Sequence, residues 1–144
     1  MKNKIYGHLK KTIVVIIGTF ALMTTNSFAG LANYENVIID VDQMWAHGDM
    51  RAARFSDNDN EYIGCGTRTY IYPDGSSYVW GFCQAGLEEN NNYMCTIENN
   101  DDLIREINGL SSYSYITFRW NEAGECTYIG HSSQSFYIPG KQDK

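Results

Sequence analysis

The sequence predicts a small α+β domain, built mainly of antiparallel β-sheet with one short helix and two disulfides. Two segments alternate apolar and polar side chains around turn residues, as β-hairpins do. A helical pattern with a capping residue lies between them, and four cysteines follow a segment that resembles an export signal. An all-β barrel or sandwich is the alternative fold.

Residues 1–29 have the three parts of a secretory signal peptide. Four lysines lie within residues 1–11, residues 12–23 are largely apolar, and the small-x-small triplet 27–29 follows. This arrangement predicts Sec export with cleavage, to the periplasm or the extracellular medium. The apolar run is short for a membrane span, so an uncleaved anchor is the less favoured alternative.

Cleavage would leave residues 30–144, enough for a single domain. It would remove four lysines and no acidic residue, so the formal net charge of −6 would become −10. We expect no binding to nucleic acid, and none to membranes after cleavage, because both attract clustered Lys and Arg. Residues 132–142 are predicted to be an extended tail, with residues 136–144 flexible.

The first strands are predicted within residues 37–55. Apolar residues alternate along residues 37–41, as in a strand. A turn is expected around Gly48 and Asp49, followed by a second strand through Phe55. A helix that starts near Val41 and breaks at Gly48 is the alternative.

A hairpin is predicted over residues 62–83. Its centre, Pro73-Asp74-Gly75, suits a three-residue loop in which a type I turn is followed by a left-handed glycine. This loop sets Tyr72 opposite Ser76, so the numbers of paired residues sum to 148. A two-residue Asp-Gly turn would shift the register by one.

The hairpin register also predicts the disulfides. It sets Cys65 opposite Cys83, and opposed residues of antiparallel strands lie within the Cα separation of a disulfide. We therefore expect a Cys65–Cys83 bond, and a Cys95–Cys126 bond by elimination. The even number of cysteines in a short exported chain agrees with this framework.

The same register sorts the hairpin into two faces, one of which is rich in aromatic residues. This face carries Arg68, Tyr70, Tyr72, Tyr78, Trp80 and Phe82. Arg68 is expected opposite Trp80, and Tyr70 opposite Tyr78, which makes a cation–π and aromatic ladder. The pattern favours packing on the core or bracing of the sheet. An exposed platform for a glycan or a partner protein is the alternative.

A short helix and a second hairpin complete the predicted domain. Asn100 or Asp101 is expected to cap the helix, and Gly109 to end it. Its apolar stripe consists of Leu103, Ile104 and Ile107. The second hairpin spans residues 113–130, and one buried face carries Ile116, Phe118 and Trp120. Residues 86–92 are predicted to be a loop.

The domain offers few residues suited to catalysis. His47 and His131 are its only histidines, and no nucleophile elbow, paired-histidine zinc motif or phosphate-binding loop occurs. We therefore expect a non-enzymatic protein with no cofactor and no catalytic residue. A small secreted hydrolase that uses acidic residues or His131 is an alternative.

One acidic segment has the spacing that begins a calcium-binding loop. Its candidate ligands are Asp57, Asp59 and Glu61. However, Tyr62 lies where an EF-hand needs glycine, and Arg68 lies where its last glutamate belongs. A polar turn is the favoured interpretation, and no metal is expected.

Several segments together resemble a group of uncharacterised small exported proteobacterial proteins. The matching segments are Gly48-Asp-Met-Arg-Ala-Ala-Arg54-Phe-Ser56, Tyr62-Ile-Gly-Cys65, the middle cysteines, Tyr115-Ile-Thr-Phe-Arg-Trp120-Asn-Glu-Ala-Gly-Glu-Cys126, and a serine-rich end with Tyr137 and Pro139. The resemblance covers most of residues 48–139. It implies export and a disulfide framework, and it brings no catalytic residues.

The leading functional hypothesis is an exported binding protein of a Gram-negative-type cell, with an unknown protein or glycan as partner. A second hypothesis is an acidic periplasmic inhibitor of a basic hydrolase such as lysozyme. The predicted charge of −10 would steer such a protein towards a cationic enzyme.

Overall fold

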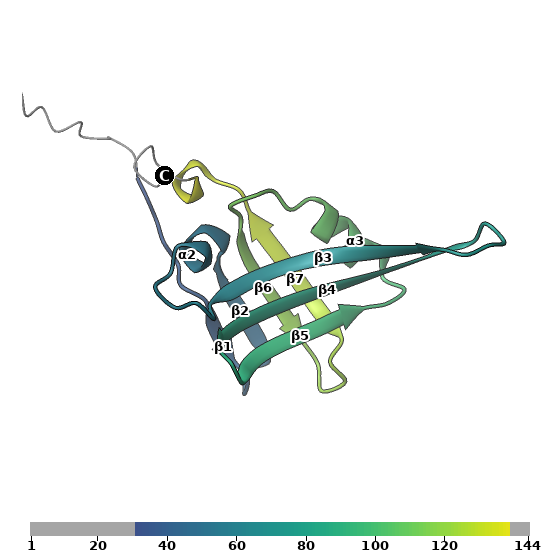
Figure 1. Ribbon diagram of the computed structural model, residues 1–144, viewed down its shortest axis with the longest axis horizontal. Coiled ribbons are helices and arrows are strands. Elements are labelled where there is room, and N and C mark those ends of the chain that lie inside the picture. The colour runs from purple at the N-terminus through teal and green to yellow at the C-terminus, as the bar shows by residue number, and fades with distance from the viewer. Residues whose placement is uncertain (1–30, 139–144) are drawn as a thin grey trace, which may run out of the picture. The chain divides into compact units, whose positions relative to one another are not determined.

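The computed structural model describes residues 31–138, in which two antiparallel sheets pack face to face (Figure 1). The predicted signal peptide and residues 139–144 lie outside the described residues. Sheet A has the strand order β1-β2-β6-β7, and sheet B has the order β3-β4-β5. The strands are β1 (Ile38–Asp40), β2 (Trp45–Asp49), β3 (Tyr62–Ile71), β4 (Ser77–Glu88), β5 (Asn91–Ile97), β6 (Tyr115–Trp120) and β7 (Cys126–Ser132). The predicted α+β class is confirmed.

The core lies between the two sheets and is closed on one side by helix α3 (Asp101–Asn108). Phe118 and Ile116 of sheet A and Cys83 and Cys95 of sheet B are fully buried. A Cβ atom at Gly81 would lie 2.8 Å from the Cδ1 atom of Ile104. The glycine therefore lets α3 approach the inner face of sheet B closely.

The predicted register of the β3–β4 hairpin is confirmed. Gly75 has a φ of +84°, and its N–H donates to the Tyr72 carbonyl at 2.9 Å. The Tyr72 N–H in turn donates to the Ser76 carbonyl at 2.8 Å. The strands then pair without interruption, with Cys65 opposite Cys83.

Both predicted disulfides are confirmed. Cys65–Cys83 links two strands of sheet B, with Cα atoms 4.0 Å apart. Cys95–Cys126 links β5 to β7 and so joins the two sheets, with Cα atoms 5.0 Å apart. No other cysteine occurs in the chain.

The predicted turn at Gly48 and Asp49 is wrong. The chain turns earlier, over residues 41–44, where Met44 has a φ of +53° and its N–H donates to the Val41 carbonyl. Gly48 and Asp49 end strand β2. A Cβ atom at Gly48 would lie 2.9 Å from the Val37 Cα atom, so this glycine serves close packing.

The second strand predicted through Phe55 is also wrong, because helix α2 (Met50–Arg54) occupies this segment. Asp49 is its N-cap, and the Asp49 Oδ1 atom accepts from the Arg51 N–H at 2.8 Å. A side-chain acceptor at this position starts a helix where a turn was expected.

The loop predicted at residues 86–92 is wrong as well. Strand β4 runs to Glu88, and β5 begins at Asn91. The ring of Tyr62 and the side chain of Asn92 lie over Gly86. These side chains cover the glycine, which favours the strand in a segment rich in turn residues.

The predictions for α3 and the second hairpin are confirmed. The Asn100 Oδ1 atom accepts from the Leu103 N–H at 3.1 Å, and Gly109 is the C-cap. Strands β6 and β7 pair with one irregularity, between Arg119 and Trp120. Beyond them, the predicted extended tail contains a 3-10 turn, Ser135–Tyr137, in which Tyr137 is buried.

Candidate functional site

The outer face of sheet B, which points away from sheet A, is the candidate functional site. Along β4, alternate residues such as Cys83 and Ala85 point inward and are fully buried. The residues between them point outward, together with their partners on the neighbouring strands. We call this surface the aromatic face; it comprises Arg68, Tyr70, Tyr72, Tyr78, Trp80, Phe82 and Met94.

The aromatic face is open to solvent in the described part of the chain. Tyr70 and Met94 are 56% and 57% exposed, and Trp80 and Phe82 are half-buried. This face does not pack on the core. At the base of the hairpin the opposite face supplies Ile63, Cys83 and Ala85 to the core, and along the projecting part both faces are exposed. Exposed aromatic side chains at this density favour binding.

The predicted ladder is present, with one change in its contacts. Arg68 faces Trp80, and Tyr70 faces Tyr78. The Arg68 guanidinium, however, lies 5.0 Å from the ring centre of Phe82, and the Phe82 and Trp80 rings are 5.4 Å apart. Phe82 therefore contacts both the cation and the indole.

Gly66 explains why Phe82 lies flat on the sheet. A Cβ atom at this position would lie 3.1 Å from the Phe82 Cζ atom. The absence of a side chain at Gly66 leaves space that the Phe82 ring fills. The Phe82 ring therefore covers Gly66 on the outer side of the sheet.

The β3–β4 hairpin extends past the other strands as an arm (Figure 1). Tyr70, Ile71 and Tyr72 are 56%, 78% and 51% exposed there. The Asp74 carboxylate at the tip accepts from the Ser76 hydroxyl and N–H. These two hydrogen bonds lower the pKa of Asp74, so the tip carries a negative charge at neutral pH.

Tyr78 on the arm is held in its neutral form. Desolvation by its neighbours raises the pKa of its phenol, and the Glu98 carboxylate raises it further. The phenol therefore keeps its proton and can donate a hydrogen bond.

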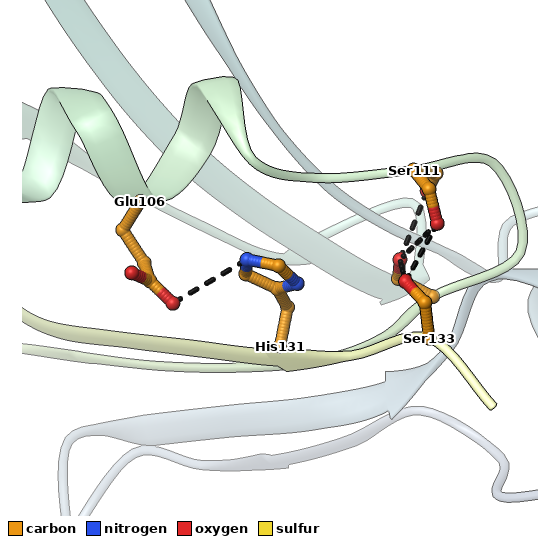
Figure 2. A network of polar contacts seen from close by, with 5 residues as sticks. Glu106, Ser111, His131 and Ser133 are labelled. Atoms are coloured by element: carbon orange, nitrogen blue, oxygen red, sulfur yellow. Dashed lines mark hydrogen bonds and ion pairs between the residues drawn. The ribbon is translucent and has the colours of Figure 1, made fainter.

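His131 lies in a polar cluster beside β7 of sheet A (Figure 2). Its Nε2 atom is 3.4 Å from the Glu106 Oε1 atom, which connects β7 to α3. Nearby, the hydroxyl oxygens of Ser111, Ser114 and Ser133 lie 2.6 to 3.1 Å from one another. These serines bond to one another within the described residues, so the cluster lacks the serine–histidine bond of a hydrolase.

His47 also has structural neighbours. Its Nδ1 atom is 2.7 Å from the Tyr115 hydroxyl oxygen, and its ring stacks on Trp45 at 4.8 Å. Burial lowers the pKa of His47, and the nearby Glu35 carboxylate opposes this effect. The neutral imidazole is therefore favoured at this position.

The candidate calcium ligands do not form a metal site. The Glu61 carboxylate accepts from the Val37 N–H at 2.8 Å and from the Ser56 hydroxyl at 2.6 Å. In the part of the chain that the structure describes, no three His, Cys, Asp or Glu residues gather as metal ligands. Asp57 and Asp59 are exposed in the polar turn that precedes β3.

A hollow of 810 Å³ lies next to the polar turn that contains Asp57. Tyr34, Arg51 and Phe55 also line it. The Arg51 guanidinium is already engaged there. It donates to the Tyr34 hydroxyl at 2.5 Å and lies 4.2 Å from the centre of the tyrosine ring. An arginine in a hollow can bind an anion, but the contacts of Arg51 with Tyr34 make this hollow a weak candidate for an anion site.

Comparison of the chain with protein-family models, curated proteins and solved structures finds no match. No helix among residues 31–138 is long and apolar enough to cross a membrane. The two disulfides are typical of proteins that fold in an oxidising compartment.

Proposed function

We propose that this chain is an exported, non-enzymatic binding protein whose binding surface is the aromatic face. The predicted signal peptide and the two disulfides support export. One observation carries the choice of surface: a row of exposed and half-buried aromatic side chains and one arginine lies on the outer face of sheet B. Tyr, Trp and Arg are the residue types that dominate the energies of binding surfaces.

None of the hollows described among residues 31–138 is lined by Tyr70, Trp80 or Phe82, which favours a partner protein or a glycan ring over an enclosed small molecule. A sugar ring stacks on aromatic faces through its C–H groups, and a protein partner would cover the row from Trp80 to Tyr70. The Arg68 guanidinium, which has five N–H donors, would donate hydrogen bonds to either partner.

A retention experiment tests this proposal. The purified protein is immobilised and exposed to a periplasmic extract and to soluble cell-wall oligosaccharides. Trp80→Ala and Tyr70→Ala remove parts of the aromatic face. Tyr128→Ala is the matched control, because Tyr128 is 49% exposed on β7 of sheet A.

We expect one component to be retained by the wild type and by Tyr128→Ala, and to be lost by Trp80→Ala and Tyr70→Ala. The melting temperatures of the two aromatic-face variants should stay close to that of the wild type. Equal retention by all four proteins would show that the aromatic face is not the binding surface.

The second candidate function, inhibition of a basic hydrolase such as lysozyme, is favoured by the charge and by the arm. Residues 31–138 contain 16 of the 17 acidic residues, five arginines and no lysine. Asp74 presents a negative charge at the tip of a projecting hairpin. Such an arm could enter the cleft of a cationic enzyme.

A lysozyme assay with excess protein tests this candidate. Inhibition that Asp74→Asn weakens, and that Asp42→Asn in the exposed β1–β2 turn leaves intact, would support it. Full enzyme activity at excess protein would remove it.

A further inference from the structure

We propose that two copies of this protein pair through their β3 edges, joining the two copies of sheet B into one six-stranded sheet. This inference goes beyond the proposed binding function. It rests on the open backbone of β3 and on the self-complementary order of the side chains from Gly66 to Tyr72.

The outer edge of β3 carries backbone groups that point away from β4. The Tyr72 N–H donates to the Ser76 carbonyl across the hairpin, and hydrogen-bonded pairs alternate along antiparallel strands. The even-numbered residues of β3 therefore bond to β4. The N–H and C=O groups of Thr67, Thr69 and Ile71 point to the outer side. There the Thr67 carbonyl accepts from the Arg68 Nη1 atom at 2.9 Å, a bond that pairing with a further strand would have to replace.

The other sheet edges of the described residues are short or protected. β1 has three residues. β5 is joined to the segment before β7 by the Thr96 N–H···Gly124 carbonyl bond and by the Cys95–Cys126 disulfide. β7 lies beside α3, where His131 contacts Glu106.

The β3 edge has no lysine, proline or bulge, although α2 and α3 contact β3 and the Arg68 side chain bonds to the Thr67 carbonyl. Natural edge strands carry lysines, prolines or bulges that exclude a further strand. Residues 65–71 contain no lysine and no proline, and the β3–β4 register is unbroken. Thr69 and Ile71 are exposed, and Ile71 is 78% exposed.

One register of self-pairing satisfies both the backbone and the side chains. It sets Thr69 opposite Thr69 of the second copy, and Thr67 opposite Ile71 of the second copy. The outward N–H and C=O groups then meet in hydrogen-bonded pairs. The exposed Ile71 is covered by a β-branched neighbour, as in stable sheets.

The same register completes the aromatic face. It sets Arg68 opposite Tyr70 of the second copy, so Arg68 has Trp80 as its neighbour on β4 and a tyrosine as its neighbour on the second copy. The guanidinium, which lies over Phe82, would then also be within reach of that tyrosine ring. It also sets Gly66 opposite Tyr72 of the second copy. Each row of the aromatic face would then continue across the two-fold axis.

Neighbouring registers are worse for identifiable reasons. Moving the second copy by two residues in one direction sets Arg68 opposite Arg68, and directly opposed like charges destabilise a sheet. Moving it by two residues the other way sets Thr67 opposite Pro73, which has no N–H to donate. The proposed register sets Pro73 opposite Cys65 instead, at the end of the paired segment, and leaves the pairs of Thr67, Thr69 and Ile71 intact. Arg68 is the one charged residue between residues 65 and 72, so the acidic excess of the chain does not fall on this edge.

Sedimentation of the purified, exported protein tests the pairing, with a matched pair of proline variants. Thr69→Pro removes an N–H that points away from β4. Ser77→Pro removes an N–H that points away from β3, beyond the last β5 partner of β4 at Gly81. We expect a concentration-dependent dimer for the wild type and for Ser77→Pro, and a monomer for Thr69→Pro.

A cysteine pair tests the register without relying on proline. Hydrogen-bonded partners of antiparallel strands have Cα atoms about 5.5 Å apart, within disulfide range. Thr69→Cys should therefore form a cross-linked dimer on mild oxidation. Thr67→Cys should not, because residue 67 faces Ile71 of the second copy.

Amide hydrogen exchange of the unmodified protein gives a third readout. The N–H groups of Thr67, Thr69 and Ile71 should exchange more slowly as the protein concentration rises. A wild type that stays monomeric up to about 1 mM, with fast exchange at these three amides, would overturn the proposal. So would equal cross-linking of Thr69→Cys and Thr67→Cys.

Discussion

Cys83 lies directly opposite Cys95 across β4 and β5, yet the two residues belong to different disulfides. Cys65 lies opposite Cys83 on the other side, so three cysteines form a row across sheet B. The Cys65–Cys83 pair is of the closely spaced, non-hydrogen-bonded type, and the Cys83–Cys95 pair is of the wider type. Because Cys95 is bonded to Cys126, it does not compete with Cys65 for a bond to Cys83.

This row predicts disulfide rearrangement in one cysteine variant and not in its counterpart. Cys126→Ser leaves the Cys95 thiol beside Cys83, so peptide mapping without reduction should find both Cys65–Cys83 and Cys83–Cys95. Cys95→Ser leaves the thiol of Cys126 unpaired on β7, away from the row, so Cys65–Cys83 alone should form. Each variant should lose about 2–5 kcal/mol of stability. A single pairing in Cys126→Ser would contradict the prediction.

Gly48 and Gly64 both lie in strands, but substitution by alanine should lower the free energy of unfolding only at Gly48. At Gly48 the new Cβ atom would lie 2.9 Å from the Val37 Cα atom, so the backbone has to move. We expect a loss of about 1–3 kcal/mol in urea unfolding. At Gly64 nothing lies within 4 Å, and Gly64→Ala should be neutral or slightly stabilising. Equal effects at both positions would refute the packing role of Gly48.

Short-range chemistry accounts for what the sequence predicted well. The Pro73-Asp74-Gly75 turn fixes the hairpin register by local geometry, and that register fixes a disulfide. The α3 cap and its glycine end are equally local signals. None of these features depends on contacts with segments that are distant in the sequence.

Long-range packing accounts for the errors. Gly48 and Gly86 both suggest turns in the sequence, but each one lies in a strand that another segment covers. The aromatic face could not be assigned either, because alternation along a hairpin is the same whichever face is buried. Strand β5 begins with Asn91 and Asn92, which are common turn residues, and its start was therefore predicted as loop.

The cap of α3 should be measurable by a single substitution. The Asn100 side chain accepts from the Leu103 N–H, which otherwise has no acceptor in the first helical turn. Asn100→Ala should cost about 1 kcal/mol of unfolding free energy. Asn100→Asp is the control, because a carboxylate also caps a helix, and it should retain the stability. Matching losses in both variants would count against the cap.

His47 should make the stability of the protein depend on pH below pH 6.5, the ordinary pKa of histidine. Burial lowers the pKa of His47 from 6.5, so the unfolded chain binds the proton more tightly than the folded chain. The stability due to His47 is therefore fully present above pH 6.5 and is lost as the pH falls towards the folded pKa.

Urea unfolding between pH 5 and pH 8 measures this effect. His47→Gln should flatten the rise of stability with pH. His131→Gln, which changes the other histidine of the described residues, should leave that part of the rise in place. An unchanged slope in His47→Gln would show that the histidine does not act this way.

The Cys65–Cys83 bond has a further consequence for a protein exposed to proteases. It closes the arm into a covalent ring that contains Arg68. Arg68 is exposed within this ring, and a trypsin-like enzyme that gained access to the strand would cut after this arginine. The two fragments would remain joined through the sulfur bridge. The chain could thus be cut in its most accessible region and still travel as one molecule until a reductant separates the pieces.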